Sequence, residues 1–443
     1  EAVFEYTFDK NIYDYHWYTG QYDYTTIQGG SSKSFVDDYL RKYKQHTNYN
    51  SINVYATYNK DFGNHHFKVM AGFNQESSYQ ETLDTYSYNQ AVLDVPAMSS
   101  GTGTIKATDS YSEYAIRGGF FRVNYNYLDK YLLEVNGRYD GSSKFPKSSR
   151  FGFFPSVSAG WQIAQERFMN STRHWLDGLK LRASYGVIGN QNINPYTFTP
   201  SMSVNNKATS WIIDDTYVTS ISSLPALVSQ NFTWEKVGTI NVGLDVNLFN
   251  NRLSGVFEWY QRNTNGMLAP GVQLPAVVGA SAPYQNTADM RTRGWELSLN
   301  WRDQIGKVGY RIGFNLSDYK SEIIKYDDNA ATKLLSSYYP GQTLGEIWGY
   351  VVDGYYTVDD FVDTSSWQLK EGVTSINGYN VRPGDVKFKN LRDDDTSTNV
   401  ITSGDNTFDN PGDRKVIGNT TPRYQYGINL GMNYAGFDLN VIL

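Results

Sequence analysis

The chain has 443 residues, a net charge of −6 and no cysteine. This balance gives no electrostatic support to a nucleic-acid partner, and it excludes disulfides and thiolate metal sites. Mean hydropathy is −0.53, and no stretch approaches the roughly 18 apolar residues that a membrane-spanning helix needs, which excludes a helical membrane protein. The 37 tyrosines and 39 glycines favour strands and turns.

Apolar and polar residues alternate along the whole chain. In YLLEVNGRYD, residues 131–140, Leu133 and Val135 alternate with Glu134 and Asn136. Successive side chains of a strand point to opposite faces, so this segment is apolar on one face and polar on the other. The other clear segments are 52–59, 67–73, 121–127, 156–163, 179–187, 240–248, 295–302, 310–317 and 426–433. We expect about 13 strands of about ten residues, the length with which a tilted strand crosses a bilayer.

Short and long connections alternate between these segments. The short ones are 61–66, 128–131, 249–252, 302–307 and 434–437, with 165–178 as an expanded case that holds a helical turn. The long ones are 75–113, 189–235, 264–291 and 320–421, with 141–152 as an intermediate case. This sorting is typical of outer-membrane barrels, whose periplasmic turns are short and whose extracellular loops are long.

Aromatic residues gather beside the turns, as Tyr127 and Tyr131 do at one turn and Trp301 and Tyr310 at another. Such rings favour the headgroup level of a membrane, although tyrosine and tryptophan are also good strand formers in soluble sheets. Together with the loop pattern, they predict an all-β, transmembrane antiparallel β-barrel with lipid outside and a wet lumen inside. Backbone groups in hydrocarbon must all be paired, so 13 strands are only part of a ring. Both ends of the sequence lie in strand-like segments, and we expect residues 1–443 to be one partial barrel domain.

Several long stretches resemble the SusC/RagA family of TonB-dependent outer-membrane transporters. These stretches are RYDGSSKFPKSSRFGFFPSVSAGWQIAQERFM (138–169), WLDGLKLRASYGVIGNQNI (175–193), NFTWEKVGTINVGLDVNLFNNRLSGVFEWYQRNTNGML (231–268), MRTRGWELSLNW (290–301), PGDVKF (383–388) and RKVIGNTTPRYQYGINLGMNYAGFDL (414–439). The resemblance covers nearly the whole chain beyond about residue 110, and the earlier part more loosely.

This resemblance implies a 22-stranded barrel filled by an N-terminal plug, in the outer membrane of a Gram-negative, Bacteroidetes-like bacterium. It implies import of oligosaccharides or peptides with a SusD-like surface lipoprotein, driven by the TonB complex and surrounded by membrane lipid and lipopolysaccharide. The plug, the N-terminal domain and the final strands are expected to lie outside this chain.

Members of the family often carry an acidic, calcium-like loop after the PGD stretch. Here the corresponding residues read NLRDDD, Asn390 to Asp395. Arg392 stands where a ligand is wanted, and no glycine supplies the sharp turn of such loops. The sequence therefore predicts neither a metal site nor any other cofactor, and a solvated acidic loop is the simpler reading.

Charged residues on the polar faces of the strands are the candidate lumen residues. They are Glu134, Arg138, Asp140, Arg182, Asp245, Glu258, Arg262, Glu296 and Arg302. Carboxylates among them could pair as acid and base, but no nucleophile elbow or phosphate loop accompanies them, so no enzyme and no catalytic residue is predicted. The long loops add candidate substrate or partner contacts at Trp211, Tyr217, Tyr338, Tyr339 and Trp348.

Two other functions stay open at this point. A passive porin-like channel would have no plug and an open conductance, and a surface adhesion protein would dissolve without detergent. The long ordered stretches favour the importer.

Overall fold

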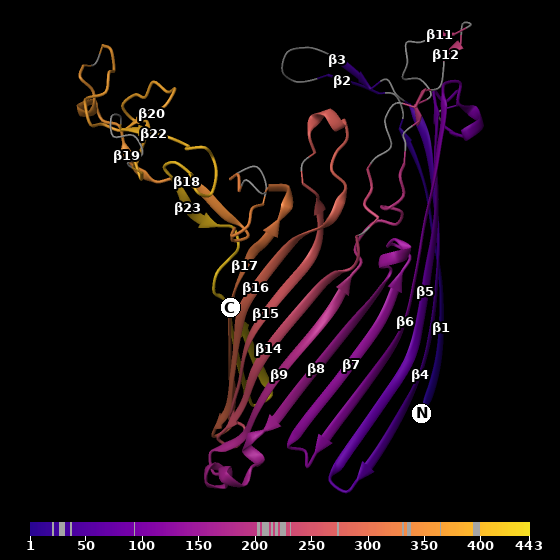
Figure 1. The fold of residues 1–443 in the computed structure, drawn as a ribbon, viewed down its shortest axis with the longest axis vertical. Helices are drawn as coiled ribbons and strands as arrows, with labels where there is room; N and C mark the ends of the chain where they lie inside the picture. The colour runs from indigo at the N-terminus through magenta and orange to yellow at the C-terminus, as the bar shows by residue number, and fades with distance from the viewer. Residues whose placement is uncertain are drawn as a thin grey trace.

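A 13-stranded antiparallel sheet dominates the computed structural model, which describes residues 1–19, 38–92, 94–201, 227–230, 232–272, 274–329, 332–334, 338–363, 365–392 and 399–443. Backbone is also described for short strands between these ranges. The sheet strands follow one another in chain order. They are β1 (Ala2–Thr19), β4 (Tyr39–Phe62), β5 (His65–Tyr88), β6 (Ile105–Tyr127), β7 (Tyr131–Ser142), β8 (Phe151–Gln162), β9 (Leu176–Asn190), β14 (Glu235–Leu248), β15 (Leu253–Pro270), β16 (Tyr284–Ile305), β17 (Val308–Tyr326), β24 (Gln425–Tyr434) and β25 (Phe437–Ile442). The sheet is open and strongly curved, and it confirms the expected all-β architecture (Figure 1).

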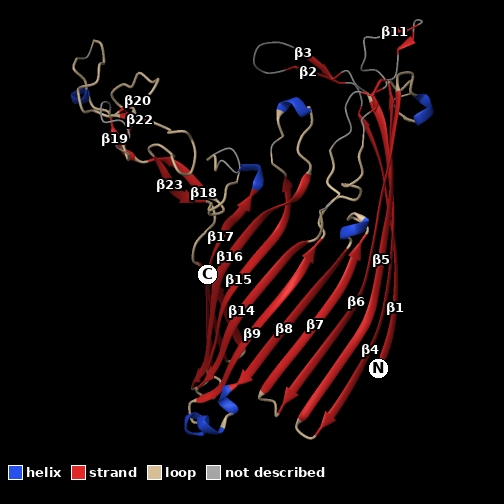
Figure 2. Ribbon diagram, in the orientation of Figure 1, coloured by secondary structure: helices blue, strands red, loops and turns tan. Residues whose placement is uncertain are grey.

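Short elements lie in the connections (Figure 2). The strands among them are β2 (Tyr22–Thr25), β3 (Ser32–Phe35), β10 (Val204–Asn205), β11 (Ile212–Ile213), β12 (Thr216–Tyr217), β13 (Ser220–Ile221), β18 (Glu346–Tyr350), β19 (Val352–Tyr355), β20 (Ser375–Ile376), β21 (Val386–Phe388), β22 (Val400–Ile401) and β23 (Arg414–Asn419). The helices are 3₁₀ turns: η1 (Met98–Ser100), η2 (Lys147–Ser149), η3 (Ile163–Gln165), η4 (Arg167–Thr172), η5 (Ala276–Val278), η6 (Asp327–Asn329) and η7 (Val358–Asp360). No helix in the described ranges is long and apolar enough to cross a membrane.

Connections at the two ends of the sheet differ in length as expected. The predicted short turns all lie at the lower end in Figure 1, where β4 and β5 are joined by only residues 63–64 and β24 and β25 by 435–436. Gly63 and Gly436 have φ of 59° and 87°, which glycine adopts without steric cost. The expanded turn at 165–178 does hold helical turns, η3 and η4. The long connections lie at the upper end.

The strands are longer than predicted. β4 and β5 have 24 residues each and β6 has 23, and β5 and β6 continue into the segment 75–113 that the sequence suggested was a loop. β15 and β16 likewise extend into 264–291. The prediction was too short because it followed only the apolar alternation, while the paired backbone continues where both faces are polar.

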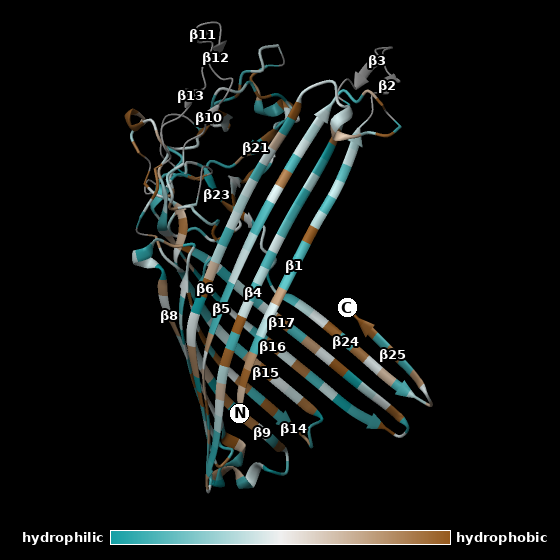
Figure 3. Cartoon of the chain, turned by 90° about the vertical axis from the view of Figure 1, so that its right-hand side faces the viewer, coloured by the Kyte–Doolittle hydropathy of each residue, from teal (hydrophilic) through white to brown (hydrophobic). Residues whose placement is uncertain are grey.

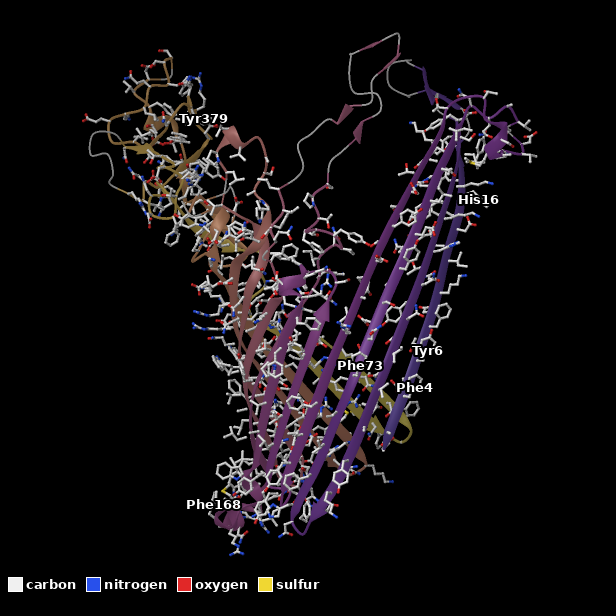
Figure 4. The ribbon with its side chains drawn as sticks, turned by 45° about the vertical axis from the view of Figure 1, so that its right-hand side comes forward. Phe4, Tyr6, His16, Phe73, Phe168 and Tyr379 are labelled. Atoms are coloured by element: carbon white, nitrogen blue, oxygen red, sulfur yellow. The ribbon has the colours of Figure 1, made fainter. Side chains whose placement is uncertain are left out.

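Register assigns every side chain of the sheet to one of two faces. The apolar band lies on the face that carries Val54, Phe73, Val135 and Leu181, and many of the large side chains on this face are exposed. Hydrophilic and hydrophobic residues alternate along the strands in Figure 3. On β1, the labelled Phe4 and Tyr6 belong to this band, whereas His16 lies near the upper end of the strand (Figure 4). We call this the outer face and the opposite one the inner face.

Spin labels at Leu181 and Arg182 test this division. Leu181 lies on the outer face and Arg182 on the inner face of β9, next to each other in sequence. We expect a label at 181 to collide mainly with dissolved oxygen and a label at 182 mainly with a water-soluble relaxant, because oxygen concentrates in acyl chains. Equal accessibility at both positions would contradict a lipid-facing outer face.

The segment between β17 and β24 forms an inserted unit with its own small core. Tyr356, Phe361 and Val381 are buried there, at 1%, 3% and 7% exposure. β18 pairs with β23, and β19 pairs with β21. The unit stands beyond the upper end of the sheet, where Figure 4 labels Tyr379.

Candidate functional site

All nine predicted lumen residues lie on the inner face. The register carries this assignment across the sheet: Glu134 stands opposite Ser158, Ser158 opposite Ser184, and the alternation then continues through β14 to β17. The charged side chains of five strands, β7, β9, β14, β15 and β16, therefore share one curved surface.

Arg182 is the centre of a charged cluster on this face. Its guanidinium donates to Asp245, at 3.1 and 3.3 Å, and to Glu258 two strands away. Between them lies Gly243, where a Cβ atom would stand 2.6 Å from Arg182 Cζ. Glu258 also accepts a hydrogen bond of 3.0 Å from Asn241. The glycine leaves the room that allows one cation to bridge two carboxylates.

The cluster keeps an excess of negative charge. Glu258 stands directly opposite Glu296 on β16, and like charges in such pairs repel. Across the described part of the chain, no ion pair forms at Glu296, Arg262 or Arg302. These three candidate lumen residues therefore share the inner face with the cluster but are not ion-paired with it.

A second polar group lies on β7. Arg138 and Asp140 form a bidentate pair with both contacts at 2.9 Å, and Glu134 accepts from Asn136 at 2.8 Å. These residues line two neighbouring concavities of about 630 and 640 Å³, which share Glu134 and Ser184. Arg182 lines the first concavity, so the two charged groups face a common space.

An aromatic cluster closes the upper end of the second concavity. Phe145, Phe154, Phe232 and Trp234 are buried together, and Trp234 donates its indole N–H to the carbonyl of Arg150 at 2.9 Å. The ring centroids of Phe145 and Phe154 lie 5.1 and 5.2 Å from that of Trp234. Sequence reasoning missed this cluster, although FGFFP and NFTWE were visible as aromatic-rich stretches.

The predicted loop contacts are only partly within the described structure. Trp211 and the side chain of Tyr217 lie outside the described residues. Tyr339 is 1% exposed and bonds through its hydroxyl to Glu346, whereas Tyr338 is 49% exposed. Trp348 is half-buried and donates to both Tyr339 and Glu346. Contact with a substrate stays a prediction, and Tyr338 is the accessible ring among them.

The acidic loop at Asn390 to Asp395 is described only as far as Arg392. Asn390 accepts from the backbone N–H of Arg392 at 3.2 Å and donates to Asn399 at 3.0 Å. The side-chain oxygen of Asn390 is thus already used within the protein. In the part of the chain that the structure describes, no group of three potential metal ligands occurs.

Low pH is expected to loosen the inserted unit. Hydrogen bonding from the backbone N–H of Thr357 at 2.7 Å, assisted by Lys387 at 3.3 Å, lowers the pKa of Asp360. Since its folded pKa lies below its unfolded value, the stabilisation is present above the unfolded pKa and is lost as pH falls through the folded pKa. Hydrogen-exchange protection around residues 357–360 should therefore fall below about pH 4. Asp360→Asn should reduce this pH dependence, and an unchanged dependence in that variant would contradict the assignment.

The comparisons with known proteins agree with this geometry. The family model described as TonB dependent receptor-like, beta-barrel, matches residues 2–442. TonB-dependent receptor P3 of Formosa agariphila is 29% identical over 442 residues, covering 95% of this chain and 40% of the relative. TonB-dependent receptor SusC of Bacteroides thetaiotaomicron is 32% identical over 283 residues, covering 62% of this chain and 27% of SusC. The chain thus spans less than half the length of these relatives.

The fold is also that of a solved transporter. The structure of the RagAB peptide transporter aligns with a TM-score of 0.73 at 20% identity, covering all of this chain and 45% of that one. Proteins of the matched family are outer-membrane receptors of Gram-negative bacteria rather than enzymes, which confirms the expected location and the absence of catalysis. The chain belongs to the TonB-dependent receptor β-barrel family.

Proposed function

We propose that this chain forms part of the barrel wall of an active nutrient importer that takes up oligosaccharides or peptides. In this proposal residues 1–443 are one part of a TonB-dependent barrel domain, a SusD-like lipoprotein caps the barrel, and the TonB complex drives it. The support comes from family membership and from relatives whose names are SusC and RagAB peptide transporter.

One observation carries the proposal. The same strands present an apolar outer face and an inner face on which charged groups line connected concavities. Such a two-faced wall separates lipid from a wet path, as transport requires. A soluble sheet would bury its apolar face in a core, but here large apolar side chains such as Phe73 and Leu181 are 44% and 40% exposed.

Uptake in cells tests the function. Cells that lack the gene, with and without a plasmid copy, are given fluorescent neutral oligosaccharides and fluorescent short peptides. The importer predicts accumulation of one class that needs both the gene and a functional TonB. Accumulation that persists without TonB would indicate a passive channel instead. A protein that leaves the envelope in buffer without detergent would refute the transport proposal altogether.

A further inference from the structure

A sheet of tyrosine rings covers the inner face near the upper ends of β1, β4 and β5. Tyr15 and Tyr43 are cross-strand partners whose rings stack with centroids 5.0 Å apart. Tyr13 packs edge-on against both, at 5.5 and 6.1 Å. Tyr39 and Tyr86 continue the surface, with centroids 5.6 Å apart. We call these five rings the tyrosine platform.

Arg41 packs against the platform, and its positive charge is neutralised by Asp84. Its guanidinium lies 5.4, 5.7 and 5.2 Å from the ring centroids of Tyr15, Tyr43 and Tyr86. The same group forms a bidentate pair with Asp84, with contacts of 2.9 and 2.8 Å. Both charges are therefore used within the protein, and the platform presents the exposed ring of Tyr13 beside the half-buried rings of Tyr15, Tyr39, Tyr43 and Tyr86.

The platform lies above the level of lipid. On β4 the outer-face residues between its rings are Lys42 and Lys44, and Lys44 pairs with Asp14 of β1 at 3.7 Å. Charged residues facing hydrocarbon cost about 2–4 kcal/mol each at the bilayer centre. The apolar band of β4 begins only at Ile52. This part of the wall thus stands outside the membrane.

We infer that the tyrosine platform is an entry site for neutral oligosaccharides, an inference that rests on the proposed function and narrows its substrate class. The positively polarised C–H groups on one face of a sugar ring suit the negative face of an aromatic ring. Phenol hydroxyls at the ring edges donate to and accept from sugar hydroxyls. Tyrosine also offers this area at a low entropic cost because few of its torsions must be ordered.

A peptide fits this surface less well. Peptides gain most from main-chain hydrogen bonds to a strand edge or from an unpaired charge. The N–H and C=O groups of β4 are paired with β1 and β5 within the sheet, so only the free edge of β1, the terminal strand of the described sheet, could take up a main-chain ligand. Arg41 and Asp84 already neutralise each other. Tyr13 is 57% exposed, so the ring face remains open to a ligand.

Binding of defined ligands to the intact transporter in detergent tests the inference. An array of neutral glycans is screened first, and the best binder is then titrated by calorimetry beside a capped, uncharged hexapeptide of glycine and alanine. The double variant Tyr15→Ala with Tyr43→Ala should weaken glycan binding about tenfold, as loss of two ring contacts implies. Tyr111→Ala is the matched control, because Tyr111 is 56% exposed on the outer face of β6 at a similar height.

Each outcome either supports or refutes the tyrosine platform as a binding site for neutral glycans. Glycan binding that falls in the double variant and holds in Tyr111→Ala supports the platform, provided that both variants insert normally into the outer membrane. Binding of the hexapeptide alone, or glycan affinity equal in all three proteins, overturns it. If TonB-dependent uptake continues unchanged in the double variant, the platform is refuted while the import function stands. Absence of TonB-dependent uptake by the wild-type protein would separately refute the import function.

Discussion

Replacing Trp234 with alanine is expected to lower the free energy of unfolding by about 3–5 kcal/mol, the usual cost of removing a large buried ring. Trp234 is 5% exposed and contacts rings from the β7–β8 connection and from β8 itself. Its loss leaves a cavity where three chain segments meet, so the connection between β9 and β14 should also become sensitive to protease. Urea unfolding of the micelle-bound protein gives the free energy.

Two variants control this result. Trp234→Phe keeps a ring but loses the hydrogen bond to the Arg150 carbonyl, so a smaller loss of about 1 kcal/mol from the missing bond is expected, besides the packing change. Phe168→Ala removes a ring that is 65% exposed at the turn end of the sheet and should change little. If Trp234→Ala and Phe168→Ala were equally stable, the cluster would not hold these loops.

Asp413→Ala should unfold the inserted unit locally. Asp413 is fully buried and accepts backbone N–H groups from Leu391, Arg392 and Thr402 at 2.7, 3.2 and 2.8 Å. Alanine would leave three buried donors without this acceptor, each at a cost of about 1–3 kcal/mol. Hydrogen exchange at these three amides should accelerate by at least a hundredfold, which about 3 kcal/mol would produce.

The matching control is Asp359→Ala, since Asp359 is exposed in the same unit. Its exchange rates should stay at the wild-type level. Slow exchange at 391, 392 and 402 in Asp413→Ala would mean that water or another group replaces the carboxylate, and the proposed role of Asp413 would then be wrong.

Much of the sheet could be predicted because successive residues of a strand lie on opposite faces, so the two faces appear in the sequence as alternating apolar and polar residues. Alternation around Leu133 and Glu134 was enough to place both side chains correctly, and loop lengths were enough to order the two ends of the sheet. The same alternation put all nine charged residues on one face. An alternating pattern is local, so it can be recognised without knowing which strands pair with one another.

Contacts between strands could not be predicted in the same way. The reach of Arg182 across β14 to Glu258 depends on Gly243 standing in register between them, and sequence alone does not give register. The aromatic cluster joins Phe145 to Trp234 across a long stretch of chain for the same reason. The platform was missed because neither Tyr13 nor Tyr15 lies in a segment of clear apolar alternation.

The inserted unit bears on how this sheet assembles. Closing a long loop costs entropy that rises with its length, and β17 must find β24 across residues 327–424. The unit shortens that search, because Leu344 bonds back to Ser321 at 2.8 Å and Thr420 to Gly345 at 2.8 Å. Once it has folded, the start of β24 already lies beside Ser317 in the middle of β17. The two strands can then pair as in an ordinary hairpin. A variant that unfolds the inserted unit should therefore slow the pairing of β17 with β24 during assembly of the barrel.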